Sequence, residues 1–283
     1  MISYRVAMEP LLPELAQKLA SGFEKSNQGC FLWVTAAILR EFSEDRDHVT
    51  PATVDAIYDF FESQSRITLR MMSTLEPREL PDIIEDFFRL LTDAILYYPH
   101  RLIPSELFPS ILQAAISALA LEQRDPLIAT LHYLRDVIAF GGNNPPCSTG
   151  KPNPPEIQTA IRQLLSVQGE SLVKGVMAGM MITFPSDCFA DGSGVLLELI
   201  ELMPQPAITW VASTVSMLPV GTVTPAESQR LIENIAVKLN DGPNGLRGIR
   251  SLLQDFTNSY RRRYIAPRDG LGRLEATRFR FSG

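Results

Sequence analysis

The charged residues with the most regular spacing lie between Leu80 and Tyr98. Acidic residues recur there at helical intervals, with one arginine among them: Asp82, Glu85, Asp86, Arg89 and Asp93. Spacings of three, four and seven residues place side chains on one face of a helix. We call these five residues the acidic strip. It is either a solvated helix face or a contact surface for a basic partner, because carboxylates attract cationic proteins through water.

Further carboxylates could extend this strip. They are Glu41, Glu44, Asp45 and Asp47 near the end of one predicted helix, and Glu198 and Glu201 in another. If helices stack side by side, these groups would widen the acidic surface. A salt-sensitive attraction for basic proteins would follow.

Metal-binding and nucleophilic chemistry has little support in the sequence. The chain has three histidines and three cysteines: His48, His100, His132, Cys30, Cys147 and Cys188. They lie in separate segments and never at ligand spacing, so we predict no metal site, no cofactor and no catalytic group. We expect His132, beside an apolar stripe, to be a packed and hydrogen-bonded histidine. The alternative, an α-helical enzyme, would require a turnover that is lost when His132 is replaced.

Composition narrows the class of protein further. The 283 residues are 45% apolar and 20% charged, which is typical of a globular chain and excludes wholesale disorder. The net charge of −6 argues against direct nucleic-acid binding. The N-terminus lacks a secretory pattern, and the apolar stretch Gly175–Phe184 is about half the length that a membrane helix needs. We therefore expect a soluble intracellular protein.

Charge is distributed unevenly along the chain. From Asn244 onward there are nine arginines against three carboxylates, a net +6, which leaves 17 basic and 29 acidic residues, a net −12, before it. Three of these arginines, Arg261, Arg262 and Arg263, fall at the end of the last predicted helix, where the helix dipole favours cations. We expect the basic tail, residues 264–283, to be disordered or loosely docked on the acidic body.

Apolar residues repeat at i, i+3, i+4 and i+7 through most of the sequence, which predicts amphipathic helices. Proline-led starts support this pattern: Thr50-Pro51, Asp125-Pro126, and Thr224-Pro225 with Glu227 as a capping box. We predict about eleven helices, over 8–24, 30–44, 51–75, 79–98, 104–122, 125–140, 155–182, 187–203, 206–218, 225–240 and 245–263. The predicted core includes Phe87, Phe88, Leu91, Leu112, Leu131 and Leu134.

The helices fall into antiparallel pairs whose first members begin near residues 8, 51, 104, 155 and 206. A spacing of roughly 45 to 50 residues is typical of HEAT hairpins, which must stack because one hairpin cannot bury its own apolar face. We therefore predict an all-α HEAT-repeat solenoid, an armadillo-like superhelix, over residues 1–263. An irregular all-α domain is the alternative. The Gly-, Pro- and Asn-rich loop 141–155 predicts an exposed connection and a possible division into two sub-arrays.

Several strings, in order along the chain, resemble one protein family. Residues Phe108 to Ile138 contain Arg124-Asp125 and Tyr133-Leu134-Arg135-Asp136-Val137, and the chain also carries Gln28-Gly29-Cys30-Phe31-Leu32 and Leu252-Leu253-Gln254-Asp255-Phe256-Thr257 before Arg261. Together, from about Pro10 to Arg263, they resemble the transportin-SR and fungal mRNA transport regulator branch of the importin-β (karyopherin) family.

The resemblance implies the C-terminal portion of a nuclear import receptor built of HEAT repeats. Such receptors shuttle between cytoplasm and nucleus, bind protein cargo, contact nucleoporins and release the cargo when they bind RanGTP. In this branch the cargo includes Arg-Ser-rich and other RNA-binding proteins. The chain resembles only about the last third of such a receptor, so the Ran-binding repeats and the arginine-rich cargo helix would lie upstream. A generic α-solenoid scaffold without a transport role is the alternative, with different partners.

Overall fold

The computed structural model describes residues 5–43, 49–146, 152–219 and 221–264. Across these ranges the chain forms helices and connecting turns and no strand, which confirms the predicted all-α fold. The chain divides into two compact units: unit 1, residues 1–168, and unit 2, residues 169–283. Helix α9 (Pro155–Ala178) crosses the boundary between them. No helix in the described ranges is long and apolar enough to cross a membrane.

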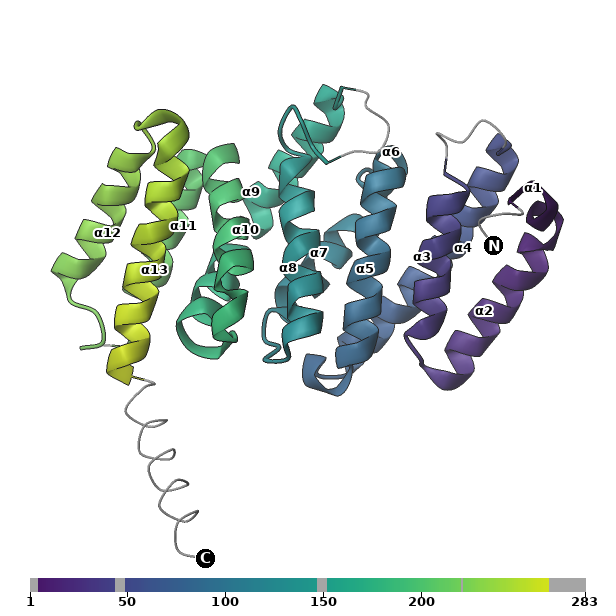
Figure 1. The fold of residues 1–283 in the computed structure, drawn as a ribbon, viewed down its shortest axis with the longest axis horizontal. Coiled ribbons are helices and arrows are strands. Elements are labelled where there is room, and N and C mark those ends of the chain that lie inside the picture. The colour runs from purple at the N-terminus through teal and green to yellow at the C-terminus, as the bar shows by residue number, and fades with distance from the viewer. Residues whose placement is uncertain (1–4, 44–48, 147–151, 220, 265–283) are drawn as a thin grey trace, which may run out of the picture. The chain divides into compact units, whose positions relative to one another are not determined.

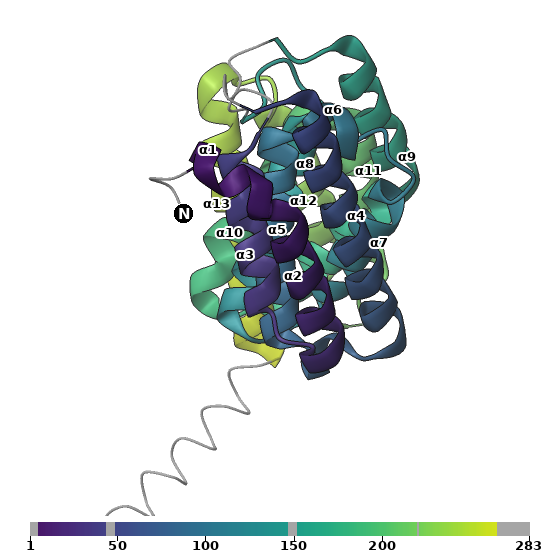
Figure 2. The same cartoon turned by 90° about the vertical axis from the view of Figure 1, so that its right-hand side faces the viewer.

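Unit 1 is a stack of helical hairpins. After the short α1 (Arg5–Met8), its helices are α2 (Leu12–Ser26), α3 (Cys30–Glu41), α4 (Pro51–Thr74), α5 (Pro81–Tyr97), α6 (Pro99–Leu102), α7 (Phe108–Ala118) and α8 (Arg124–Ala139). The hairpins are α2–α3, α4–α5 and α7–α8. Their second helices, α3, α5 and α8, lie side by side in one layer, and α4 and α7 lie in the layer behind (Figures 1 and 2).

The core of unit 1 forms where α5 packs closely between α3 and α8. All six predicted core residues are buried: Phe87, Phe88, Leu91, Leu112, Leu131 and Leu134. The Phe88 ring lies 5.7 Å from that of Phe87 and 5.5 Å from that of Tyr133, in tilted arrangements that aromatic pairs prefer. The apolar stripe predicted between Leu80 and Tyr98 is therefore the buried face of α5.

Unit 2 holds the end of α9 with α10 (Phe189–Leu202), α11 (Pro204–Ser216), α12 (Pro225–Lys238) and α13 (Gly245–Tyr264). Successive helices pack on one another here too: α10 on α11, α11 on α12 and α12 on α13. Helix α13 packs against both α10 and α12, and α11 packs against α10 and α12. Helix α13 thus packs against α10 as well as against the helix that precedes it in the chain.

Capping side chains explain where several helices begin. The Thr50 hydroxyl accepts a hydrogen bond from the Thr53 amide at the start of α4. Thr224 and Glu227 form the predicted capping box of α12. The prediction that Asp125 caps the next helix is wrong, because α8 begins at Arg124 and its N-cap residue is Gln123. Asp125 lies inside the first turn and pairs with Arg124 instead.

Helix α9 ends in a way that periodicity could not predict. It stops at Ala178 and continues as a π-helical turn, Gly179–Thr183, closed by a hydrogen bond from the Phe184 amide to the Gly179 carbonyl. A Cβ on Gly179 would lie 2.1 Å from the Phe184 ring, so only glycine fits beneath it. The predicted continuous helix 155–182 is thus interrupted. The predicted sub-array division at 141–155 stays a prediction, and tail residues 265–283 lie outside the described residues.

Candidate protein-interaction surface

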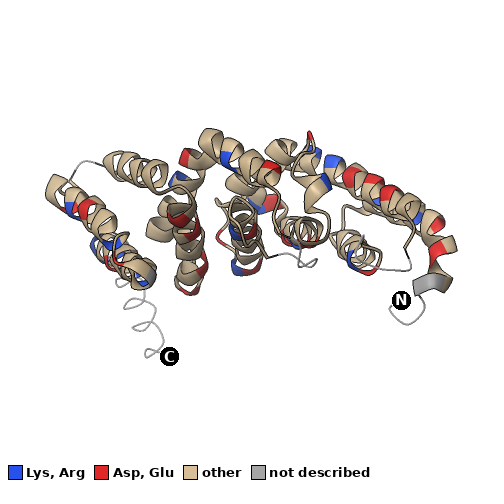
Figure 3. Ribbon diagram, turned by 90° about the horizontal axis from the view of Figure 1, so that it is seen from above, with Lys and Arg blue, Asp and Glu red and all other residues tan. Residues whose placement is uncertain are grey.

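The acidic strip lies along α5, where its five residues share the helix with the buried aromatic face. Asp82 and Arg89 are exposed, and Glu85, Asp86 and Asp93 are half-buried. Figure 3 shows carboxylates and basic residues interspersed along the helices of unit 1 rather than segregated. The strip is therefore a mixed surface with an acidic excess, and its members differ in how freely they could meet a partner.

Asp93 is the least accessible member. Its carboxylate forms an ion pair with the Arg40 guanidinium of α3, and its side chain is only 15% exposed. Burial raises the pKa of Asp93, and the charge and hydrogen bond of Arg40 act in the opposite direction. Because it bridges two helices, Asp93 stabilises the packing of α3 on α5 whether or not it also contacts a partner.

Glu85 sits at the centre of a group of like charges. It pairs with Arg89 one turn later, with 2.6 Å between the two side chains. Burial raises the pKa of Glu85, Arg89 lowers it, and Asp125, Asp86 and Asp82 raise it further. Asp125 belongs to the first turn of α8, so carboxylates from two helices act on one region. That region would be stabilised by an incoming cation.

The first turns of α3 lie against the acidic strip at one residue and carry an exposed aromatic ring at another. A Cβ on Gly29 would lie 2.3 Å from Asp86 Oδ2, so the missing side chain lets that carboxylate reach the first turn of α3. Trp33 follows one helical turn later and is 57% exposed. An exposed indole can stack on a guanidinium. Trp33 was not predicted as a site residue, although it lies off the apolar stripe of its helix.

The other predicted carboxylates are less well placed. Glu41 is half-buried at the end of α3, and Glu44, Asp45 and Asp47 lie outside the described residues. Glu198 is half-buried and Glu201 is exposed on α10, in unit 2. They therefore belong to a different compact unit from the strip.

The histidines and cysteines are dispersed. His132 is half-buried on α8. Burial raises the pKa of Asp136 on the same helix, whereas Arg135 and then His132 lower it. His100 and Cys30 are exposed, Cys188 is buried, and His48 and Cys147 lie outside the described residues. Over the ranges that the structure covers, no three His, Cys, Asp or Glu residues gather as a metal site.

The arginines at the end of α13 have specific partners within unit 2. Arg261 donates from Nε to the Met180 carbonyl at 2.7 Å and from Nη2 to the Phe184 carbonyl at 2.6 Å. Arg261 therefore supplies hydrogen bonds to backbone carbonyls at the end of α9. The attraction of arginines to the C-terminal end of the α13 dipole does not predict this contact. Among the residues that the structure describes, Arg262 donates only to the Asn258 carbonyl of its own helix, at 3.3 Å.

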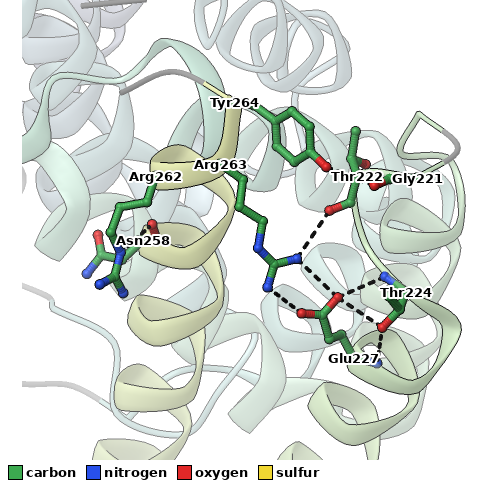
Figure 4. A network of polar contacts seen from close by, with 8 residues as sticks. All are labelled: Gly221, Thr222, Thr224, Glu227, Asn258, Arg262, Arg263 and Tyr264. Atoms are coloured by element: carbon green, nitrogen blue, oxygen red, sulfur yellow. Dashed lines mark hydrogen bonds and ion pairs between the residues drawn. The ribbon is translucent and has the colours of Figure 1, made fainter. Parts of the chain in front are cut away.

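Arg263 links the end of α13 to the start of α12 (Figure 4). It forms an ion pair with Glu227 and donates to the Thr222 carbonyl, while Tyr264 donates its hydroxyl to the Gly221 carbonyl. The hydrogen bonds from Arg263, then those from Thr224, lower the pKa of Glu227 to about 2. Two of the three clustered arginines are thus engaged within the fold.

Comparison with known proteins gives relatives along most of the chain. No protein-family model matches it. An uncharacterized protein of Schizosaccharomyces pombe is 35% identical over 261 residues, 91% of this chain and 27% of that protein. The mRNA transport regulator MTR10 of Saccharomyces cerevisiae is 26% identical over 281 residues, 94% of this chain and 28% of its own. Transportin MOS14 of Arabidopsis thaliana is 22% identical, over 79% of this chain and 22% of its own.

The chain spans about a quarter of the length of the curated relatives that it matches. The relatives with descriptive names are transport proteins, and the match covers both compact units rather than one short motif. The all-α hairpin architecture agrees with them. Over most of its length the chain is therefore a homologue of karyopherin-family proteins, in agreement with the resemblance seen in its sequence.

Proposed function

We propose that the chain is the C-terminal HEAT-repeat portion of a nuclear import receptor and that it contributes a binding surface for protein cargo. The observation that carries this proposal is similarity to an mRNA transport regulator along 94% of the chain. The stacked hairpins support it, because solenoids bind proteins along extended helical surfaces. The function is recognition by shape and charge, without a chemical step.

The proposed cargo is an Arg-Ser-rich or other RNA-binding protein, met on the α3–α5–α8 layer of unit 1. Asp82 and Glu85 would attract its arginines, and Trp33 would accept a guanidinium on its ring face. Repeats outside this chain would bind the Ran GTPase, and the whole receptor would contact nucleoporins and shuttle between cytoplasm and nucleus. Charge complementarity is what supports this choice of cargo.

The test is fluorescence anisotropy with a labelled Arg-Ser-repeat peptide, unphosphorylated and phosphorylated, at two salt concentrations. We expect the unphosphorylated peptide to bind more tightly, since phosphate adds negative charge opposite the carboxylates. Higher salt should weaken this binding. Binding of neither form would overturn the proposal for these repeats and place cargo recognition elsewhere in the longer receptor.

A charge-reversal pair locates the surface. Asp82→Lys with Glu85→Lys should weaken peptide binding by about tenfold or more, while helical circular dichroism stays unchanged. Asp86 is left intact because its carboxylate packs against Gly29. The matched control is Glu24→Lys with Asp59→Lys, two exposed residues of α2 and α4 that give the same change in net charge. Equal weakening by both pairs would show that net charge, not the strip, controls binding.

A further inference from the structure

The layer of unit 1 that contains α4 and α7 carries a groove of different character from the acidic strip. It has a volume of about 550 Å³ and runs between the second half of α4 and α7. It is lined by α4 between Arg66 and Ser73, by Pro77, Leu80 and Leu107, and by α7 between Ser110 and Ser117. None of the lining residues is acidic, in a chain whose net charge is −6.

The floor of the groove is apolar and adaptable. Leu80 and Leu107 are buried beneath it, and Leu69 and Met72 are half-buried along its side. Methionine has a flexible, polarizable side chain that can adjust to different apolar partners. A large apolar side chain placed on this floor would lose its contact with water, which favours binding.

The rim of the groove is cationic. Arg66 and Arg70 are four residues apart and therefore on the same face of α4. Arg66 is partly neutralised by Glu62, at 3.2 Å. Arg70 is exposed, and its guanidinium forms no hydrogen bond or ion pair with a residue in the described ranges. Ser110, Gln113 and Ser117 add hydrogen-bonding groups on the α7 side.

The dimensions suit a short stretch of polypeptide. The α7 lining from Ser110 to Ser117 extends about 10 Å, at roughly 1.5 Å per residue. An extended segment rises about 3.3 Å per residue, so three or four residues would fill the groove. If one large apolar side chain of such a peptide lay on the floor, the adjacent residues of the peptide would lie beside Arg66 and Arg70.

We infer that this groove binds an acidic segment of a partner protein in which a large apolar side chain is flanked by carboxylates. The apolar side chain lies on Leu69, Met72 and Leu107, and the carboxylates meet Arg66 and Arg70. The inference does not depend on the proposed cargo surface, because it uses another layer of unit 1 and a partner of opposite charge.

The probe is a fluorescein-labelled peptide with one phenylalanine and one leucine among four glutamates, titrated with the 283-residue chain. We expect saturable binding that weakens as salt is added. Two further peptides separate the contributions: one has glutamine in place of each glutamate, and one has serine in place of both apolar residues. Each should bind at least about tenfold more weakly than the parent peptide. Equal affinity for either would overturn the inference.

Variants of the chain locate the site. Arg70→Glu should reduce affinity for the acidic peptide by about tenfold, whereas Arg250→Glu, the same charge change at an exposed residue of α13, should leave it nearly unchanged. Ser117→Trp, at an exposed position of the lining, should also weaken binding by filling the groove. Circular dichroism must show that each variant is folded.

Crossing the two probes keeps the two surfaces distinguishable. Arg70→Glu should leave binding of the Arg-Ser peptide intact, and Asp82→Lys with Glu85→Lys should leave binding of the acidic peptide intact. If Arg70→Glu binds the acidic peptide as well as the unchanged chain does, the groove is not the site and the inference fails. That result would not affect the proposed cargo surface.

Discussion

Helix α5 packs mainly between α3 and α8, and α13 packs mainly against α10 and α12, but the two helices are held by different forces. Helix α5 buries eight residues, all apolar: Ile83, Ile84, Phe87, Phe88, Leu90, Leu91, Ala94 and Ile95. Helix α13 is longer, yet it buries only Gly245, Ile249, Leu253, Thr257 and Tyr260. Its remaining attachment comes from Arg261, Arg263 and Tyr264, which donate hydrogen bonds to α9 or α12 and the adjoining turns.

This difference shows how one array can use two means of fixing a helix. Apolar burial is proportional to area and non-directional, so it attaches α5 strongly and defines its rotation through shape. Hydrogen bonds from Arg261 are directional, so they fix where α13 lies along α9 although α13 buries less apolar area. The comparison predicts large losses from deletions in α5 and selective losses from deletions in α13.

The largest effect should come from Phe88→Ala. Phe88 has no exposed surface and contacts two aromatic rings, so its deletion leaves a cavity. We expect the free energy of unfolding to fall by about 3 kcal/mol, measured by urea denaturation with circular dichroism. Val167→Ala, at a residue 79% exposed, is the control and should change it by less than about 0.5 kcal/mol. Equal midpoints for Phe88→Ala and the unchanged chain would contradict the burial of α5.

A smaller effect is expected from Arg261→Ala in α13. The Met180 and Phe184 carbonyls would lose their donors, which typically costs about 1 to 3 kcal/mol for buried groups. The neighbouring Arg262→Ala removes the same charge but only a bond within its own helix, so it should change stability by less than about 0.5 kcal/mol. Similar losses from the two variants would show that α13 is not held by directional contacts.

The smallest effect should be the pH dependence of the exposed pair between Arg263 and Glu227. The pKa of Glu227 is lowered to about 2, below its ordinary value of about 4.3, so the folded state binds fewer protons there. The stabilisation is then full above that ordinary value and is lost as the pH falls toward 2. Glu227→Gln should therefore destabilise the chain at pH 7 and make less difference at pH 3.

The pKa of Glu85 on α5 is shifted in the opposite direction to that of Glu227, so its effect on stability has the opposite sign. Burial raises its pKa, so its charged form is disfavoured in the folded state, and this cost disappears as the pH falls below the unfolded pKa. Urea denaturation at both pH values should show that Glu85→Gln is no less stable than the unchanged chain at pH 7. A Glu85→Gln loss that matched the Glu227→Gln loss at pH 7 would remove the contrast between the two regions.

The agreement between predicted and observed helices has a local cause. Apolar periodicity, proline at first helical positions and the caps at Thr50 and Thr224 are all encoded within a few residues. The six predicted core residues follow from the same periodicity, because a wide apolar stripe has to face the neighbouring helices. The π-helical turn after Ala178 was not predicted, because it depends on a distant residue. Arg261, far along the chain, donates a hydrogen bond to the Met180 carbonyl in this turn.

The candidate surface could also be predicted only in part, because spacing along one helix is local and contacts between helices are not. Spacing placed Asp82, Glu85, Asp86, Arg89 and Asp93 on α5. It could not show that Asp93 pairs with Arg40, that Asp86 lies against Gly29, or that Trp33 is exposed on the adjacent helix. The groove of α4 and α7 was also invisible, because two arginines at i and i+4 become its rim only when a second helix supplies the other wall.

The fold class, most of the helices, the main core face and the kinship with transport proteins all follow from the amino-acid sequence alone. These depend on periodicity and residue order, which are written directly in the chain. The packing of α13 against α10, and the use of Arg261 and Arg263 within the fold, become visible once the helices are assembled. The assembled structure alone separates the carboxylates that bridge helices from those that face solvent. The physical reason is that packing order and charge pairing depend on which distant surfaces meet, and the local sequence does not specify those partners.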